Sequence, residues 1–192
     1  MALWREETVP VELTSRLITM RAPLGDDYDA WAKLRSASRN HTSPWEPAWS
    51  ADELTRSSYR KRIRSYETAW HEGSGYPFFV FRRKDHVFLG ACNLNNVRRG
   101  VLQAADIGYW IGTPYLRRGF AREAVRLIVG FAFDEVGLHR IEAACRPEND
   151  PSKTLLTGLG FQPEGIARKY LKIAGEWHDH EKFALLSSDA RP

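Results

Sequence analysis

The spacing of apolar residues alternates along the chain between the two-residue period of strands and the wider period of helices. Residues 15–21 alternate as a strand does, and the capping-box spacing of Ser50 and Glu53 predicts a helix that runs to about His71. The other predicted strands cover residues 76–82, 87–95, 101–111, 139–145, 164–172 and 178–186. The other predicted helices cover residues 26–39, 122–135 and 150–159, and an ordered loop covers residues 41–49.

The elements between residues 101 and 145 determine the centre of the predicted sheet. Strand 101–111 is followed by helix 122–135 and strand 139–145. A strand–helix–strand unit of this kind makes a right-handed crossover between two parallel strands. The remaining strands follow one another as hairpins and pair antiparallel. We therefore predict an α/β (α+β) fold, with a mixed, mostly antiparallel sheet flanked by helices and one central parallel pair.

Length and composition indicate a folded globular protein. The 192 residues are 43% hydrophobic, enough for one domain over residues 1–192 with a substantial core. The sequence has no run of about 18 apolar residues that would span a membrane, and the charged N-terminus lacks the apolar segment of a signal peptide. Cys92 and Cys145 belong to no CxxC motif or Cys/His cluster, so we expect buried cysteines without a disulfide or a metal. These features favour a cytoplasmic protein.

Residues 106–121 have the most specific pattern in the chain, a hydrophobic strand followed by a Gly/Pro break and a basic turn that opens a helix. A helix that begins at a glycine turn presents unpaired N–H groups and its positive dipole end to an anion. Arg117, Arg118 and Arg122 add positive charge. The pattern predicts a phosphate-binding turn beside an apolar strand, suited to a ligand with a polyphosphate group and a thin chain.

A second polar segment, Asn149-Asp150-Pro151-Ser152, follows the returning strand 139–145. Taken alone, these residue types are ordinary helix-capping residues. However, both this segment and the basic turn lie at the same end of one parallel strand pair, where α/β sheets bind ligands. Capping and ligand binding are both open for Asn149 and Ser152.

Basic residues gather in two further places, although the net charge of the chain is only +4. One is the turn with Arg98 and Arg99. The other is the predicted second helix, with Arg56, Arg60, Lys61, Arg62 and Arg64. Such clusters form either a solvated face or a surface that attracts an acidic partner such as RNA or a nucleotide.

The order of these motifs resembles the GNAT acyltransferase superfamily and, within it, the RimJ/RimL ribosomal-protein N-terminal acetyltransferases. The motifs are Asp-Ile-Gly-Tyr-Trp-Ile from Asp106, Arg-Arg-Gly-Phe-Ala-Arg-Glu-Ala from Arg117, Asn149-x-x-Ser152, and Leu-Gly-Phe-x-x-Glu-Gly from Leu159. Residues 40–47 (Asn-His-Thr-Ser-Pro-Trp-Glu-Pro) and 175–179 (Gly-Glu-Trp-His-Asp) match as well. The likeness covers about residues 15–187 and implies that the central parallel strands splay apart.

The resemblance implies that acetyl-CoA is the acetyl donor, and no metal cofactor is expected. The pantetheine arm would pair with the backbone at Trp110 and Ile111 and accept a hydrogen bond from Asn149. Ser152 would donate a hydrogen bond to the departing thiolate as a general acid. The pyrophosphate would bind Leu116, Arg117, Arg118, Gly119, Phe120 and Ala121.

The chain departs from the superfamily pattern at three places. Leu116 and Arg117 replace the Arg/Gln-Gly that usually begins the phosphate-binding turn. Leu156 lies where many members have a tyrosine acid, which leaves Ser152 as the candidate acid. Leu171 lies where the RimL branch has an acidic base.

The base and the acceptor are less determined. Asp106, Glu46 or His178 could act as a base through water, or the amine could arrive neutral, because an α-amine has a pKa of about 7.7–8.0. The resemblance implies a ribosomal protein with an N-terminal alanine as acceptor, with Trp45, Glu46 and His178 on the acceptor side. A small-molecule amine is an alternative. So is a non-catalytic CoA- or ribosome-binding module that lies near RNA through its basic clusters. The sequence leaves open a monomer or a homodimer.

Overall fold

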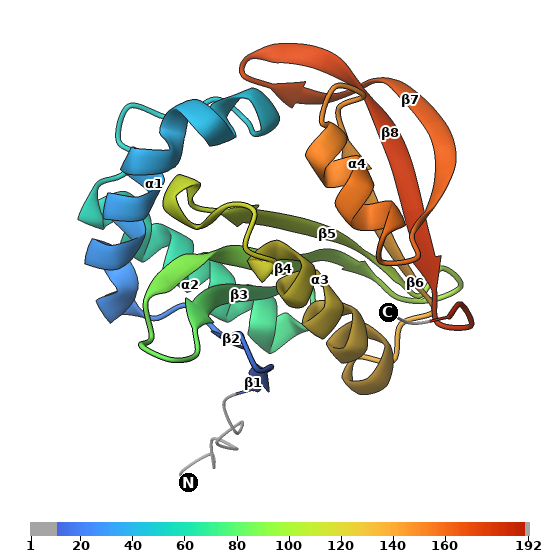
Figure 1. The fold of residues 1–192 in the computed structure, drawn as a ribbon, viewed down its shortest axis with the longest axis horizontal. Coiled ribbons are helices and arrows are strands. Elements are labelled where there is room, and N and C mark those ends of the chain that lie inside the picture. Colours follow the sequence, from blue (N-terminus) through green and yellow to red (C-terminus); the bar gives the residue numbers. More distant parts are fainter. Residues whose placement is uncertain (1–10, 191–192) are drawn as a thin grey trace, which may run out of the picture.

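The computed structural model describes residues 11–190, which form an eight-stranded sheet with helices on both faces (Figure 1). The strands are β1 (Glu12–Thr14), β2 (Ile18–Arg21), β3 (Tyr76–Arg82), β4 (Phe88–Arg98), β5 (Ala104–Ile111), β6 (Arg140–Cys145), β7 (Gln162–Ile173) and β8 (Glu176–Leu186). The helices are α1 (Tyr28–Thr42), α2 (Arg56–Glu72), α3 (Phe120–Gly130) and α4 (Asp150–Thr157). The strand order is β1-β2-β3-β4-β5-β6-β8-β7, and all neighbours are antiparallel except β5 and β6. The mixed sheet predicted from the sequence is confirmed.

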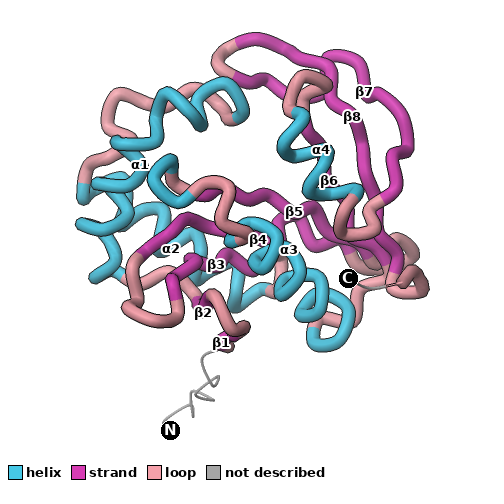
Figure 2. Tube along the Cα trace, viewed as in Figure 1, coloured by secondary structure: helices cyan, strands magenta, loops and turns pink. Residues whose placement is uncertain are grey.

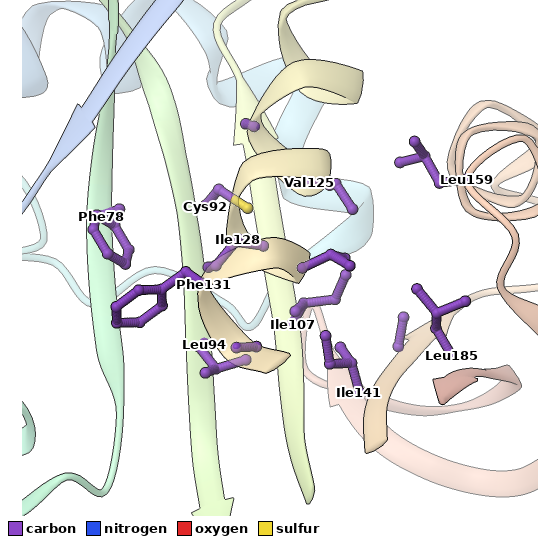
Figure 3. Close-up of a cluster of buried hydrophobic side chains, with 14 of the residues drawn as sticks. Phe78, Cys92, Leu94, Ile107, Val125, Ile128, Phe131, Ile141, Leu159 and Leu185 are labelled. Carbon is purple, nitrogen blue, oxygen red and sulfur yellow. The ribbon is translucent and has the colours of Figure 1, made fainter. Parts of the chain in front are cut away.

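Strand β3 supplies side chains to two hydrophobic cores, one on each face of the sheet. Phe78 and Val80 point into the larger core, which α3 and α4 cover. Phe79 and Phe81 point into the smaller core under α1 and α2. Figure 3 shows the larger core, where Ile128 of α3 lies over the sheet beside Cys92 and Leu94. Because β3 is buried on both faces, its sequence is a continuous apolar run rather than an alternating one.

The parallel strands β5 and β6 pair over only a short length. Their partners are Ala104 with Arg140, Ala105 with Ile141 and Asp106 with Glu142. Beyond these pairs both strands continue without pairing to each other, and in Figure 2 the two parts of the sheet spread apart there. The backbone groups of β5 that do not bond to β4 therefore face the opening between the diverging strands.

The start of α2 differs from the sequence prediction. The capping box expected at 50–53 is not formed, because the Ser50 hydroxyl is bonded to the carboxylate of Asp52 at 2.8 Å. The N-cap is Thr55, whose side chain accepts the backbone N–H of Ser58 at 3.2 Å. Both serine and threonine can cap a helix, so the sequence pattern alone does not select between the two positions.

Other elements also differ from the sequence prediction, among them β2 and β5, which begin at Ile18 and Ala104 rather than at 15 and 101. Helix α1 continues into the expected loop 41–49, and Ser43–Trp45 add a short 3₁₀ turn. Strand β1 was not predicted, since three residues are too few to show a period. The helix expected at 122–135 begins at Phe120, and its last turn, Phe131–Glu135, is a π-helix.

The two cysteines have the environment that the sequence predicts. Cys92 and Cys145 are both free and buried, so neither forms a disulfide.

No helix within residues 11–190 is long and apolar enough to cross a membrane. No group of three or more His, Cys, Asp or Glu residues that could hold a metal ion is found over the same range.

Candidate active site

The turn between β5 and α3 has the backbone geometry of an anion-binding loop. Arg117 and Gly119 have φ angles of 57° and 79°, and Gly119 is the N-cap of α3. Turns with left-handed residues make concave anion sites from successive N–H groups, and the first N–H groups of a helix have no partner within it. Arg117, Arg118 and Arg122 are exposed. Phe120, the first residue of α3, is buried and holds the start of the helix on the core. The turn therefore offers both N–H groups and positive charge.

Arg117 holds a left-handed conformation, which costs a residue with a side chain about 1–2 kcal/mol. A glycine would adopt the same conformation without this strain. Arg117→Gly relieves that strain but adds about 0.5–1 kcal/mol of backbone entropy to the unfolded chain. We therefore expect its free energy of unfolding, measured by chemical denaturation, to stay level or rise slightly. Arg118→Gly is the matched control, because Arg118 has no positive φ and gains only the entropy cost. Equal destabilisation by both variants would contradict the strained turn.

Strand β5 provides the second wall of the site. Its last residues, Trp110 and Ile111, pair with Ala91 and Gly90 of β4 on one side only. On the other side β6 has already diverged. An extended ligand can therefore add to this edge of β5 and receive backbone hydrogen bonds as a further strand would.

Ser152 lies in the first turn of α4 and is joined to β5 through its side chain. Its Oγ is 2.7 Å from the hydroxyl of Tyr109. Its backbone N–H donates to Oδ1 of Asn149 at 3.2 Å, so Asn149 is the N-cap of α4. Capping uses only the amide oxygen, and the amide NH₂ can still donate to a ligand. The structure thus brings Asn149 and Ser152 next to the strand that precedes the basic turn.

Sequence reasoning missed Tyr109. It lies on β5 next to Trp110 and points to the opposite face of the sheet, since side chains alternate along a strand. Its ring packs against the larger core, and its hydroxyl meets a residue 43 positions away. The sequence holds no local signal for this contact, because it depends on how α4 is placed over the diverging strands.

Neither cysteine is prepared to act as a nucleophile. Burial raises the pKa of the Cys92 thiol well above its ordinary value. Burial also raises the pKa of Cys145 to about 11, against a smaller opposing effect of its hydrogen bond with Ser152. Both thiols therefore stay protonated near neutral pH, and the thiolate is the reactive form of cysteine. This chemistry favours direct transfer to an acceptor over a covalent acyl-cysteine.

Glu46 was predicted on the acceptor side and as a candidate base, but donors of the protein already bond its carboxylate. It accepts hydrogen bonds from Nη2 of Arg35 at 2.9 and 3.1 Å, from the Thr42 hydroxyl at 2.8 Å and from Nε1 of Trp49 at 2.7 Å. The Arg35 guanidinium also lies over the rings of Trp49 and Trp110, at 4.6 and 4.9 Å from their centroids. Glu46 therefore organises the loop after α1, and its charge is balanced by Arg35.

The same loop is bonded to two other segments of the chain. The backbone N–H of Ala174, at the tip of the β7–β8 hairpin, donates to the carbonyl of Glu46 at 3.1 Å. Arg146, in the segment before α4, donates to the Pro44 carbonyl at 3.2 Å and lies 5.7 Å from the ring centroid of Trp45. Figure 1 shows the end of α1 and the β7–β8 hairpin approaching each other at the top of the molecule. These contacts make a continuous rim that includes Trp45 and Glu46.

His178 lies on β8 near that rim, half-buried and opposite Leu171 of β7. Its backbone carbonyl is 3.0 Å from Nδ1 of His180. Burial lowers the pKa of His180, so that imidazole is neutral at neutral pH. The structure shows no hydrogen bond between the side chain of His178 and Asn149 or Ser152.

Asp106 is held in an ion pair. Its carboxylate accepts bonds from Nη1 and Nη2 of Arg98 at 2.9 and 3.1 Å and from Asn96 at 2.9 Å. Burial alone would raise the pKa of Asp106, but these donors outweigh it and hold the pKa below its usual value. A carboxylate with a lowered pKa is a weaker base, so this environment argues against Asp106 as a proton acceptor.

Comparison with known proteins gives a match over most of the chain. The model of a family described as Acetyltransferase (GNAT) domain matches residues 17–162. The chain is 32% identical over 191 residues to the ribosomal protein uS5-alanine N-acetyltransferase of Escherichia coli, covering 98% of this chain and 97% of that protein. It is 39% identical over 156 residues to a probable N-acetyltransferase of Bacillus subtilis, YjcK, covering 81% and 86% of the two chains.

Two solved structures are similar over nearly the whole fold. The ribosomal-protein-S5-alanine acetyltransferase from Vibrio fischeri superposes with a TM-score of 0.86 at 30% identity, over 95% of this chain and 100% of that one. RimJ of Mycobacterium smegmatis, solved in complex with CoA-disulfide, superposes with a TM-score of 0.85 at 32% identity, over 93% and 87% of the two chains.

Proposed function

The chain belongs to the GNAT acetyltransferase family, and from this premise we propose that it acetylates the N-terminal alanine of a ribosomal protein. Membership makes it an acyl-CoA-dependent N-acetyltransferase with acetyl-CoA as co-substrate. The observation that supports the acceptor is the similarity, over almost all of both chains, to the uS5-alanine enzyme of Escherichia coli. We further propose that residues 1–192 work as one catalytic domain, in the cytoplasm where ribosomal proteins are made.

In this proposal acetyl-CoA binds along the two walls described above. The pyrophosphate lies on the N–H groups of the turn from Leu116 to Ala121, with Arg117 and Arg118 adding charge. The pantetheine arm extends along the free edge of β5 at Trp110 and Ile111. Support comes from the left-handed turn and from the early end of β5–β6 pairing, which leaves room and unpaired backbone groups for such a ligand.

The acetyl group then passes directly from sulfur to nitrogen. The neutral amine attacks the thioester carbonyl carbon, a C–N bond forms, and the C–S bond breaks to release the thiolate of CoA. The hydroxyl of Ser152 donates a hydrogen bond to the developing thiolate. Asn149 orients the pantetheine arm through a hydrogen bond from its amide NH₂. The raised pKa of Cys145 supports this direct route, because a protonated Cys145 thiol next to Ser152 is a poor nucleophile for a covalent acyl-cysteine route.

Removal of the amine proton needs little help from the protein. An α-amine with a pKa of about 7.7–8.0 is partly neutral at pH 7 to 7.5. The carboxylates of Asp106 and Glu46 are both occupied by arginine, so we propose that the amine arrives neutral and that water takes the remaining proton after attack. His178 is the remaining titratable side chain that we place on the acceptor side.

The rim formed by residues 43–47 and the β7–β8 hairpin suits a thin, extended acceptor better than a bulky one. Ala174 and Arg146 bridge to this loop, and we place the entry of the amine beside Trp45, inside these contacts. Outside the rim, the exposed α2 residues Arg60 and Lys61 provide a positive surface on which ribosomal RNA could rest.

The acceptor is tested by measuring release of free CoA thiol with a panel of amines. We expect kcat/KM for a peptide with the uS5 N-terminal sequence to exceed that of the same peptide beginning with proline or glutamate by at least about tenfold. Mass spectrometry should locate the acetyl group on the α-amine, and the N-acetylated peptide is the control without an acceptor. Turnover of small amines but no peptide would replace this proposal by small-molecule acetylation, and no turnover together with acetyl-CoA binding would indicate a binding module.

A further inference from the structure

We propose that Tyr109 is a positioning residue for the transfer step, which holds and polarises the hydroxyl of Ser152. The inference rests on the role proposed above for Ser152. The observation behind it is the 2.7 Å contact between the two hydroxyl groups, which joins β5 to α4.

Tyr109 lies where β5 is paired with β4 on one side but no longer with β6 on the other. It lies beyond Asp106, the last residue of β5 that pairs with β6, and its ring packs on the larger core. This packing restricts the ring to one orientation and therefore fixes the position of its hydroxyl. Ser152 is then held from two directions, at its backbone N–H by Asn149 and at Oγ by Tyr109.

The hydroxyl–hydroxyl contact can run in either direction, and the protonated state of the phenol allows Tyr109 to be its donor. Burial raises the pKa of Tyr109, and this outweighs the opposing effect of the bond to Ser152, so the phenol keeps its proton. When Tyr109 donates to Oγ of Ser152, the serine proton can turn from its other partner, the Cys145 thiol, to the departing sulfur. Hydrogen bonds in series polarise one another, which makes the serine a better donor. The buried Leu156 offers no hydroxyl from α4, so this second hydroxyl comes from the opposite wall.

The test is a double-mutant cycle on kcat with the acceptor peptide. We expect Tyr109→Phe to lower kcat by about tenfold, the loss expected for one hydrogen bond, with KM for acetyl-CoA within about twofold. In the Ser152→Ala background the same substitution should lower kcat no further, because the bond it removes is already absent. Tyr59→Phe is the matched control: it removes a buried hydroxyl that donates to the Leu24 carbonyl at 2.7 Å, and should cost stability but not kcat.

Each outcome bears on the proposal. Unchanged kcat in Tyr109→Phe, or a loss that multiplies in full with that of Ser152→Ala, overturns the positioning role and leaves the role of Ser152 intact. Unchanged kcat in Ser152→Ala overturns both. If Tyr109→Phe fails to fold, 3-fluorotyrosine placed at position 109 keeps the ring and hydroxyl but lowers the phenol pKa. It should change kcat with Ser152 present and not with Ser152→Ala, and no change in either background overturns the proposal.

Discussion

Replacing Ser152 by alanine is expected to lower kcat for acetyl transfer by about 100- to 1,000-fold. The hydroxyl acts only once charge develops on the departing sulfur, so its loss should raise the barrier without weakening the bound donor. We therefore expect the Kd for acetyl-CoA, measured by calorimetry, to stay within about threefold. Steady-state thiol release with the alanine peptide measures kcat.

The fold supplies a matched control for this substitution. Ser58 also lies in the first turn of a helix, α2. Its hydroxyl takes part in an exposed hydrogen bond to the carboxylate of Asp52. Ser58→Ala should therefore leave kcat unchanged. Full activity of Ser152→Ala would remove Ser152 from the chemistry. A loss confined to Kd would make it a binding residue, with the thiolate then leaving unassisted.

The strand, turn and helix of the proposed donor side could be predicted from the sequence because each of them is local. A buried strand, a glycine turn and a helix face are each determined by neighbouring residues, and the crossover rule then makes β5 and β6 parallel. The turn survives the replacement of its usual glycine by Arg117 because the side chain points to solvent and the backbone keeps its left-handed φ. Local pattern and a chirality rule were sufficient to predict these elements and their arrangement.

The acceptor side could not be predicted in the same way, because its properties come from contacts between distant segments. Nothing near Glu46 in the sequence shows that Arg35, which lies within α1, will neutralise its charge. Likewise the Arg98 ion pair turns Asp106 from a candidate base into a structural anion. In each case the residue type suggested chemistry, and the tertiary partner determined whether the group was free to perform it.

Strand β1 and the start of α2 were missed for a simpler reason. A three-residue strand at the sheet edge gains its stability from pairing with β2, not from its own residues. Ser50 and Thr55 are comparable caps in isolation, and the path of the loop from α1 decides between them. Short elements and helix ends are therefore the least determined by local sequence.

A single methyl group added at Gly90 should cause a large loss of stability. A Cβ there would lie 2.1 Å from the carbonyl oxygen of Trp110 and 3.0 Å from Cα of Ile111, both backbone atoms of β5 that cannot rotate away. Gly90 is also at φ 156°, where a side chain is strained. We expect Gly90→Ala to lower the free energy of unfolding by about 3 kcal/mol, from overpacking and backbone strain together.

The same substitution should weaken donor binding, because the displaced atoms belong to the part of β5 on which pantetheine is proposed to lie. Gly100→Ala separates this effect from strain alone: it has φ 68° but open space around its Cβ, so it should cost about 1–2 kcal/mol and leave the Kd for acetyl-CoA unchanged. Chemical denaturation and calorimetry measure the two quantities. If Gly90→Ala destabilised the fold but kept the Kd of the unaltered protein, the pantetheine arm would not depend on the backbone at Trp110, and the proposed donor path along β5 would be wrong.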